Sequence, residues 1–372
     1  MKIQAALART TSGPFTIETL ELDDPRPDEI RVRIVGVGVC HTDLVALGGG
    51  TPVPLPAVFG HEGAGVVEAI GSAVTKVAVG DHVVLTFRSC GSCRRCQAGD
   101  PAYCADLVPL NYGGGRSDGI SPLCCGGAPV SGAFFSQSSF ATHALAYERN
   151  VVKVPKSAPL WQLGPLGCGV QTGAGAAMNA LACEAGSSLL IIGGGSVGLS
   201  ALMGGVVQGC ARLLVVEPFA ERRELALALG ATDVIDPAAE PDIAAAVRAR
   251  LPMGVDYALD TTGKSALLDA ALDALAKRGV LGVLGIPAPD TPTPGKLAAV
   301  MRSGLTIRGI VEGDSDPDIF IPRLVELFLA GRLPIDRITT RYDFADINQA
   351  IADQHAGRCV KIILTHDAAG AD

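Results

Sequence analysis

The sequence predicts an α/β protein of two domains, one rich in β-strands and one built on a doubly wound parallel sheet. At 372 residues, the chain is longer than one typical hydrophobic core supports. In its second half, the apolar run 189–192 is followed at once by the glycine pattern Gly193-x-Gly195-x-x-Gly198. Beyond residue 217, helical and strand-like segments alternate, which is typical of a parallel sheet covered on both faces.

The glycine pattern lies inside a strand–helix–strand unit. A helical pattern runs to about Gln208, and a second apolar run, 213–216, ends in Glu217. The glycines allow a tight turn and a close approach of the backbone to a pyrophosphate, which binds at the helix N-terminus. Glu217 lies 22 residues after Gly195, where a carboxylate accepts hydrogen bonds from an adenosine ribose. A glycine turn alone occurs in many α/β proteins, but this complete order of features favours nucleotide binding.

Composition excludes several classes of partner. The net charge of −8 argues against nucleic acid or an anionic membrane. No apolar run reaches transmembrane length, and the N-terminus lacks a signal-peptide core, so we expect a soluble, cytoplasmic protein. Eleven cysteines in such a chain are more typical of metal ligands or buried thiols than of disulfides.

The N-terminal segment is predicted to be β-rich. Residues 30–35 alternate apolar and charged side chains, as in a strand with one solvated face. A loop dense in potential ligands follows, with the sequence Cys40-His41-Thr42-Asp43. The segment Gly60-His61-Glu62-Gly63 then leads into a strand at 66–70, and residues 80–85 form a turn and another strand.

The most specific spacing in the chain is a group of four cysteines, Cys90, Cys93, Cys96 and Cys104. Four thiolates this close, in a loop with two glycines, suit a tetrahedral zinc ion with a closed coordination shell. Such a site holds a loop in place and leaves no open position for catalysis. Four incidental buried thiols are the alternative, but cysteine is too rare for this clustering to favour it.

Residues 107–135 are expected to form a loop, in which the pair Cys124-Cys125 is interpreted as two unligated thiols. Phe134, Phe135 and Phe140 follow in a chain with only 4% aromatic residues. These rings belong either to the core or to the wall of an apolar pocket, and the sequence does not separate the two.

The remaining elements follow in order. A helix of small residues opens after Gly164 and leads to the glycine turn. We then expect helices at 221–229, 242–250 and 266–276, and strands at 233–236, 255–260, 279–285 and 307–311. The tail is predicted to hold helices at 321–330 and 344–355 and a closing strand at 359–364.

Together these motifs resemble the zinc-containing alcohol dehydrogenases of the medium-chain dehydrogenase/reductase superfamily. The resemblance covers nearly the whole chain and is greatest to the bacterial aryl (benzyl) alcohol dehydrogenase branch, which includes geraniol-type enzymes. It rests on the segments already quoted and on 164–169, 134–143 and 216–218. It implies a GroES-like catalytic domain at 1–169 and 312–372, with a structural zinc lobe at about 88–106. A Rossmann NAD-binding domain at 170–311 and a homodimer or homotetramer are also implied.

The resemblance also implies roles for individual residues. Cys40, His61 and Cys168 match the ligands of a catalytic zinc, and three ligands leave a fourth position for water or alcohol. Asp43 matches the carboxylate that orients the zinc histidine, and Glu62 matches a carboxylate behind the metal. Thr42 matches the hydroxyl that hydrogen-bonds the substrate oxygen. Cys90, Cys93, Cys96 and Cys104 match the ligands of a second, structural zinc.

Further positions match cofactor contacts in the family. These are His41 at the pyrophosphate, Thr172 and Val197 behind the nicotinamide, the glycines 193, 195 and 198, Glu217, Arg222 and Lys361. Glu217 repels a 2′-phosphate, so NAD is favoured over NADP, while Arg222 and Arg223 keep NADP as the alternative. The sequence departs from many alcohol dehydrogenases at Val45, where those enzymes have a proton-relay histidine. The proton is then expected to leave by another route.

The implied function is reversible oxidation of aromatic or allylic primary alcohols, of the benzyl, cinnamyl or geraniol type, to aldehydes. Hydride would pass to NAD from a zinc-bound alkoxide, with Phe134 and Phe135 as candidate walls of the substrate pocket. One alternative is the same chemistry on an aliphatic or thiol-adduct alcohol. Another, from a different class, is a non-catalytic nucleotide-binding relative, which is disfavoured because the zinc triad is intact.

Overall fold

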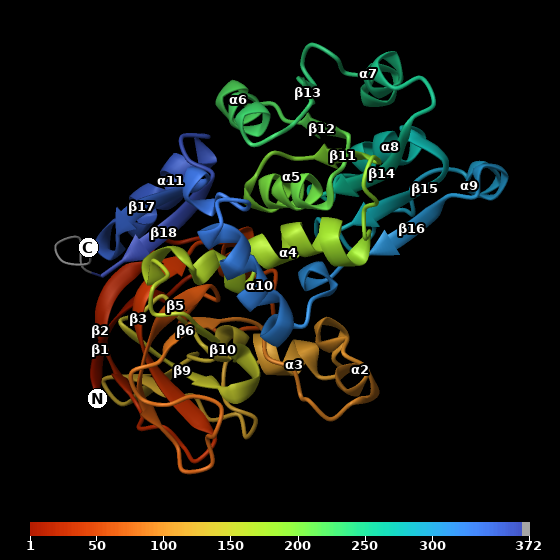
Figure 1. The fold of residues 1–372 in the computed structure, drawn as a ribbon. Coiled ribbons are helices and arrows are strands. Elements are labelled where there is room, and N and C mark those ends of the chain that lie inside the picture. The colour runs from red at the N-terminus through yellow and green to blue at the C-terminus, as the bar shows by residue number, and fades with distance from the viewer. Residues whose placement is uncertain (367–372) are drawn as a thin grey trace. The chain divides into compact units, whose positions relative to one another are not determined.

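A computed structural model describes residues 1–366 of the protein (Figure 1). The described chain divides into two compact units, one formed by residues 1–168, 316–329 and 335–366 and the other by 169–315 and 330–334. These bounds differ from the expected division because Gly169 and residues 312–315 and 330–334 group with the second unit. There Ser315 Oγ donates a hydrogen bond to Gln171 Oε1 at 3.1 Å.

Two sheets form most of the first unit. Within the described residues, the smaller has the strand order β4-β1-β2-β7-β8 and the larger has the order β10-β6-β5-β3-β18-β17, with β9 also paired to β3. The strands of the smaller sheet are β1 Lys2–Ala8, β2 Thr16–Leu22, β4 Ala57–Val58, β7 Leu123–Cys125 and β8 Ala128–Val130. Those of the larger are β3 Glu29–Gly38, β5 Gly63–Ile70, β6 His82–Leu85, β9 His143–Tyr147, β10 Val151–Val154, β17 Thr339–Asp343 and β18 Lys361–Thr365.

The tail of the chain completes the larger sheet. β18 runs antiparallel to β3, with Ile363 opposite Gly38, and Figure 1 shows the blue strand β18 beside the red-to-orange strand β3. This register places the start of β18 next to the segment that follows β3, where the first potential ligands lie. The helices of this unit are α1 His41–Leu47, α2 Arg94–Gln97, α3 Leu107–Tyr112, α10 Pro317–Leu329 and α11 Ile347–His355.

The second unit is a doubly wound parallel sheet. Its strands have the order β13-β12-β11-β14-β15-β16, the arrangement of a dinucleotide-binding fold, in which two βαβαβ halves meet between β11 and β14. The strands are β11 Ser188–Ile192, β12 Arg212–Val216, β13 Asp233–Ile235, β14 Val255–Asp260, β15 Leu275–Val283 and β16 Thr306–Gly309. The helices are α4 Gly169–Gly175, α5 Ser196–Gln208, α6 Ala220–Ala228, α7 Ile243–Arg250, α8 Ser265–Asp273 and α9 Leu297–Ser303.

The predicted α/β fold class is confirmed, and the elements of the second unit lie close to their predicted positions. The differences fall in the first unit. The ligand-rich segment after Gly38 was expected to be a loop, but its residues from His41 on form helix α1. Residues 107–135 were also expected to form a loop, but they contain α3, β7 and β8. These elements were missed because segments this short carry too little periodicity to be predicted.

Each unit has its own hydrophobic core. In the first, apolar faces of both sheets pack around buried aromatic rings that include Phe59, Phe134 and Phe140. In the second, strands such as β11 and β14 pack against α7 and α8. Within residues 1–366, no helix has the length and apolarity needed to span a bilayer.

Candidate active site

Four potential metal ligands from distant parts of the sequence meet inside the first unit. Cys40, His61, Glu62 and Cys168 each offer one ligand atom, and these atoms all lie within 4.8 Å of one another. Cys40 is the N-cap of α1, whereas His61 and Glu62 lie in the turn between β4 and β5. Gly60 precedes them with φ +88°, and a Cβ there would lie 2.4 Å from the backbone nitrogen of Phe140. Only glycine fits at this position, and the turn is fixed as a result.

Asp43 holds three parts of this cluster together. Its Oδ1 accepts hydrogen bonds from His61 Nδ1 at 2.8 Å and from the Gly60 amide at 3.0 Å. Its Oδ2 accepts one from the Cys40 amide at 2.9 Å. Because a carboxylate can only accept, His61 carries its proton on Nδ1, which leaves Nε2 as the atom able to bind a metal.

The chemistry of these donors fits zinc. His61 Nε2 is buried and has no hydrogen-bond partner among the described residues. A buried imidazole nitrogen left without a donor is costly unless a ligand fills its place. Two thiols and one imidazole are a ligand set that zinc favours, and three protein ligands leave one position open.

Glu62 has a buried counter-ion. Lys361 Nζ, at the start of β18, lies 2.5 Å from Glu62 Oε2 and donates to the Val39 carbonyl at 3.0 Å. Burial raises the pKa of Glu62 to about 7, although the adjacent ammonium opposes this. The resemblance implied a cofactor contact for Lys361. Within the first unit its ammonium contacts Glu62 and Val39 and its side chain is almost fully buried, and the cofactor contact stays a prediction.

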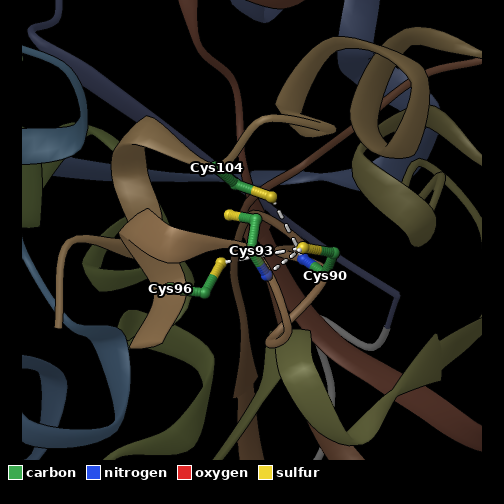
Figure 2. Close-up of side chains that lie close together, drawn as sticks. All are labelled: Cys90, Cys93, Cys96 and Cys104. Atoms are coloured by element: carbon green, nitrogen blue, oxygen red, sulfur yellow. Dashed lines mark hydrogen bonds between the residues drawn. The ribbon is translucent and has the colours of Figure 1, made fainter. Parts of the chain in front are cut away.

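A second cluster holds Cys90, Cys93, Cys96 and Cys104, whose sulfur atoms also lie within 4.8 Å of one another. Figure 2 shows the four thiols gathered around one point, with Cys93 and Cys96 at either side of the start of α2. Cys90 Sγ lies 4.0 Å from Cys96 Sγ and accepts a hydrogen bond from the Cys93 amide at 3.3 Å. The Ala105 amide is the largest of the causes that lower the pKa of Cys93 to about 6. A thiolate is the form that zinc binds.

Aromatic rings pack against His61. The ring of Phe135 is stacked on the imidazole, with centroids 4.4 Å apart and planes 27° apart. Phe134 meets the imidazole and the rings of Phe59 and Tyr112 edge-on. Phe134 and Phe135 are both buried in the core of the first unit, and Phe135 has φ +50°. Its left-handed backbone is a strained conformation for an aromatic residue, and here it places the ring against a candidate metal ligand.

Sequence reasoning missed a buried amide that supports the same turn. Gln137 Oε1 accepts a hydrogen bond from the Gly63 amide at 3.1 Å, and its Nε2 donates to the His61 carbonyl at 2.9 Å. Gln137 therefore fixes the backbone on both sides of Glu62. Gln137 lies in the segment 134–143 that carries the family resemblance, but no chemistry marks the glutamine itself. Its partner Gly63 is 74 residues away in the sequence, so the contact could not be foreseen.

The glycine turn lies entirely within the second unit. Gly193 has φ +103°, and a Cβ on Gly198 would lie 1.8 Å from the Gly193 carbonyl oxygen. α5 begins directly after Gly195. Glu217 is buried at the end of β12, where its Oε2 accepts a hydrogen bond from the Gly194 amide at 2.7 Å. The acid and the glycine turn are thus brought together as the sequence predicted.

The other predicted cofactor residues belong to both units, His41 to the first and Thr172, Val197 and Arg222 to the second. His41 is exposed at the start of α1, and the guanidinium of Arg222 lies 4.8 Å from the ring of Phe219. Thr172 Oγ1 donates to Glu312 Oε2 at 3.2 Å. Val197 lies in the first turn of α5, and its carbonyl closely faces Gly173.

Comparison with known proteins decides the family. Residues 26–156 match the family model "Alcohol dehydrogenase GroES-like domain", and residues 196–329 match "Zinc-binding dehydrogenase". The chain is 49% identical to the geraniol dehydrogenase of Castellaniella defragrans over 97% of each chain. This chain belongs to the zinc-containing medium-chain alcohol dehydrogenases.

Solved structures agree with this assignment. The alcohol dehydrogenase zinc-binding domain protein from Burkholderia ambifaria superposes on this dehydrogenase with a TM-score of 0.96, at 49% identity, over 98% of this chain and 99% of that one. The benzyl alcohol dehydrogenase from Acinetobacter calcoaceticus gives a TM-score of 0.94 at 43% identity, over 98% and 99% of the two chains. The family resemblance and the GroES-like and Rossmann architecture predicted from the sequence are both confirmed.

Proposed function

We propose that this alcohol dehydrogenase oxidises allylic or aryl primary alcohols to aldehydes with NAD as the hydride acceptor. The observation that carries the proposal is the aromatic packing of Phe134 and Phe135 against His61, one of the donors of the buried cluster. Flat, unsaturated alcohols suit aromatic surroundings, because ring faces and edges attract other π systems. Two relatives, the geraniol dehydrogenase and the benzyl alcohol dehydrogenase, favour the same substrate class.

In this proposal Cys40, His61 and Cys168 hold the catalytic zinc. Zinc with an open coordination position lowers the pKa of a hydroxyl that binds there and polarises it for oxidation. Asp43 keeps the imidazole in the tautomer that offers Nε2, through the hydrogen bond to Nδ1. Lys361 balances the charge of Glu62, so that this carboxylate stays buried behind the two thiols.

Thr42 is the proposed first acceptor of the substrate proton. Its Oγ1 lies 3.8 Å from Cys40 Sγ, beside the ligand cluster. A threonine hydroxyl cannot be the final base, so the proton needs an onward route. The relay histidine of many relatives is replaced by Val45, and we propose that water and the cofactor ribose provide the route instead.

NAD is favoured by Glu217. Its carboxylate is buried at the end of β12 and is aligned by the Gly194 and Phe219 amides at 2.7 and 3.0 Å. A carboxylate in this place accepts hydrogen bonds from the ribose hydroxyls and repels a 2′-phosphate. His41, Thr172, Val197 and Arg222 are the further proposed cofactor contacts.

We propose that the four-cysteine cluster binds a second, structural zinc and that each chain holds two zinc ions. Its donors are all sulfur, which gives a closed shell that is suited to holding a loop. The first unit would then be the catalytic domain and the second the NAD-binding domain.

A homodimer or homotetramer is proposed through the edge of the parallel sheet. β15, which includes the glycine-rich segment after residue 279, pairs with β14 and β16 and so is not free to pair with a partner. β16 is the edge strand, and Leu297 and Met301 of the nearby α9 are highly exposed. We expect Leu297→Asp with Met301→Asp to lower the mass measured by light scattering. Ile319→Asp, an equally exposed site in the other unit, should leave it unchanged.

The deciding experiment measures initial rates of NAD reduction with geraniol, benzyl alcohol and ethanol, with NADP in parallel. Rates on the two unsaturated alcohols far above the rate on ethanol are expected. A preference for ethanol would overturn the substrate class, and faster reduction of NADP would overturn the cofactor assignment. Elemental analysis of the same preparation should give two zinc ions per chain, and one ion would remove one of the two proposed sites.

A further inference from the structure

A basic side chain beside Glu217 is engaged by other groups of the protein. Arg223 lies on α6, in the segment that follows the acidic tip of β12. An arginine in this neighbourhood is the feature by which related folds accommodate NADP. The presence of an arginine at position 223 therefore does not by itself decide between NAD and NADP.

The structure gives the guanidinium of Arg223 three other acceptors. One nitrogen donates to the Glu217 and Pro218 carbonyls at 2.8 and 2.7 Å. The other forms an ion pair with Asp236 Oδ2 at 2.9 Å. The side chain of Arg223 is 18% exposed and that of Asp236 is 31% exposed, so the pair is only partly open to solvent.

Asp236 is itself fixed. It follows the last residue of β13, and its Oδ1 accepts a hydrogen bond from the Ala238 amide at 2.9 Å. β13 and β12 are adjacent parallel strands, so Asp236 and Glu217 follow their strands at the same edge of the sheet. Ligands of such sheets bind at this carboxyl edge.

We propose that Asp236 is a specificity-determining residue, which enforces NAD by holding Arg223 away from a 2′-phosphate. This inference rests on the proposed binding of an adenosine ribose beside Glu217. Glu217 repels the phosphate directly, and Asp236 acts separately by withdrawing the cation that would attract it. A neutral residue at 236 frees the Arg223 nitrogen that pairs with Asp236, while the other nitrogen keeps the Glu217 and Pro218 carbonyls. The freed nitrogen can then donate a charge-assisted hydrogen bond to the phosphate.

The test measures binding of two cofactor fragments to the otherwise unliganded protein by calorimetry. Adenosine 5′-monophosphate reports the nucleotide site, and adenosine 2′,5′-bisphosphate adds the 2′-phosphate. The ratio compared is the dissociation constant of the bisphosphate divided by that of the monophosphate. Asp236→Asn should lower this ratio by about tenfold, the effect of one charge-assisted hydrogen bond. Binding of the monophosphate should stay near the wild-type value.

Two further variants decide the cause. Asp233→Asn removes an equal charge from the other end of β13, where Asp233 pairs with Arg212 at 2.7 Å, and should leave the ratio unchanged. Asp236→Asn combined with Arg223→Ala should return the ratio to the wild-type value. The inference is overturned if Asp236→Asn does not improve the relative affinity for the bisphosphate, or if the improvement persists when Arg223 is also replaced. Failure of every variant and of the wild type to bind the monophosphate overturns the proposed NAD site itself.

Discussion

Asp43 Oδ1 and His61 Nδ1 are joined by a 2.8 Å hydrogen bond between two fully buried side chains. Asp43 lies on α1, and the same carboxylate also accepts the amides of Cys40 and Gly60. One side chain therefore sets both the direction of the imidazole and the position of a thiol ligand. The cluster is built around a carboxylate that is not itself among the ligand candidates.

Replacing this carboxylate should weaken the metal site. Asp43→Asn keeps one oxygen acceptor but removes the charge. Its NH2 group conflicts with the Cys40 amide if it replaces Oδ2, or with the Gly60 amide and His61 Nδ1 if it replaces Oδ1. We expect a loss of about 10- to 100-fold in zinc affinity or in kcat/KM. Zinc content after dialysis and initial rates check this. Asp81→Asn, at a carboxylate that pairs with Lys153 in the same unit, should retain full zinc content.

Removing a thiol from the four-cysteine cluster should lower the stability of the protein more than its catalytic activity. Cys104→Ser is expected to lower the zinc content from two ions to one and to lower the Tm, because a structural zinc site contributes folding free energy. Cys124→Ser is the matched control, since Cys124 lies on β7 outside both ligand clusters. Retention of both zinc ions by Cys104→Ser would remove Cys104 from the ligand set.

The ion pair of Glu29 and Arg116 predicts a dependence of stability on pH. Arg116 Nε donates to Glu29 Oε1 at 2.7 Å, and Tyr147 donates to the same oxygen at 3.0 Å. Burial raises the pKa of Glu29. The hydrogen bonds from Arg116, the Arg26 amide and Tyr147, together with the charge of Arg116, outweigh burial and lower this pKa below its usual value. A lowered pKa in the folded state means that the carboxylate stabilises the protein above its unfolded pKa. That contribution is lost as the pH falls through the lower, folded value.

Glu29→Gln should therefore reduce stability at neutral pH by on the order of 2 kcal/mol, since it leaves the buried Arg116 with Asp23 as its remaining charge partner. The variant should also lose less stability than the wild type between pH 7 and pH 3. Urea unfolding at a series of pH values measures both effects. Glu18→Gln breaks the exposed pair with Arg9 and should cost at most about 1 kcal/mol. Equal acid sensitivity in wild type and Glu29→Gln would exclude Glu29 as the source.

Phe135 offers a test of the substrate class. Phe135→Leu removes the ring stacked on His61 but retains most of the apolar volume. We expect kcat/KM for benzyl alcohol to fall roughly threefold to tenfold more than kcat/KM for ethanol, in line with the free energy of one aromatic pair. Phe15→Leu changes a ring that contacts Phe59 and Phe140, and it should affect both alcohols equally. If Phe135→Leu lowers kcat/KM equally for benzyl alcohol and ethanol, Phe135 is not a wall of the substrate pocket.

Residues carried by short motifs were the predictable part of this protein. The glycine turn and Glu217 were placed correctly because a strand, a turn and a helix follow one another within one local unit. The four-cysteine cluster was equally clear, since its spacing is local. Cys40 and Cys168 could be paired only through the family resemblance.

The supporting contacts could not be predicted. Gln137 lies in a segment that carries the resemblance and Lys361 was matched to a cofactor contact. Their contacts with the cluster form only after β-strands far apart in the sequence have paired. The helix α1 was missed because its seven residues are held by Asp43 and by the surrounding fold more than by an apolar periodicity. In strand β17, half-buried and exposed residues do not alternate as in a strand with one buried face. The strand is therefore recognised only from its pairing with β18.

The pairing of β18 with β3 sets an order of events during synthesis. Lys361 follows Val39, whose carbonyl it contacts, by 322 residues. At about 5–20 residues per second, the ribosome adds Lys361 roughly 15 to 60 seconds after the segment around Cys40. Until then Glu62 lacks its cation, and the end of β3 at 36–38 lacks the neighbour that β9 provides for residues 29–33. The nascent chain therefore carries its thiols and imidazole in an unfinished site, and metal is expected to be captured tightly only once translation has passed β18.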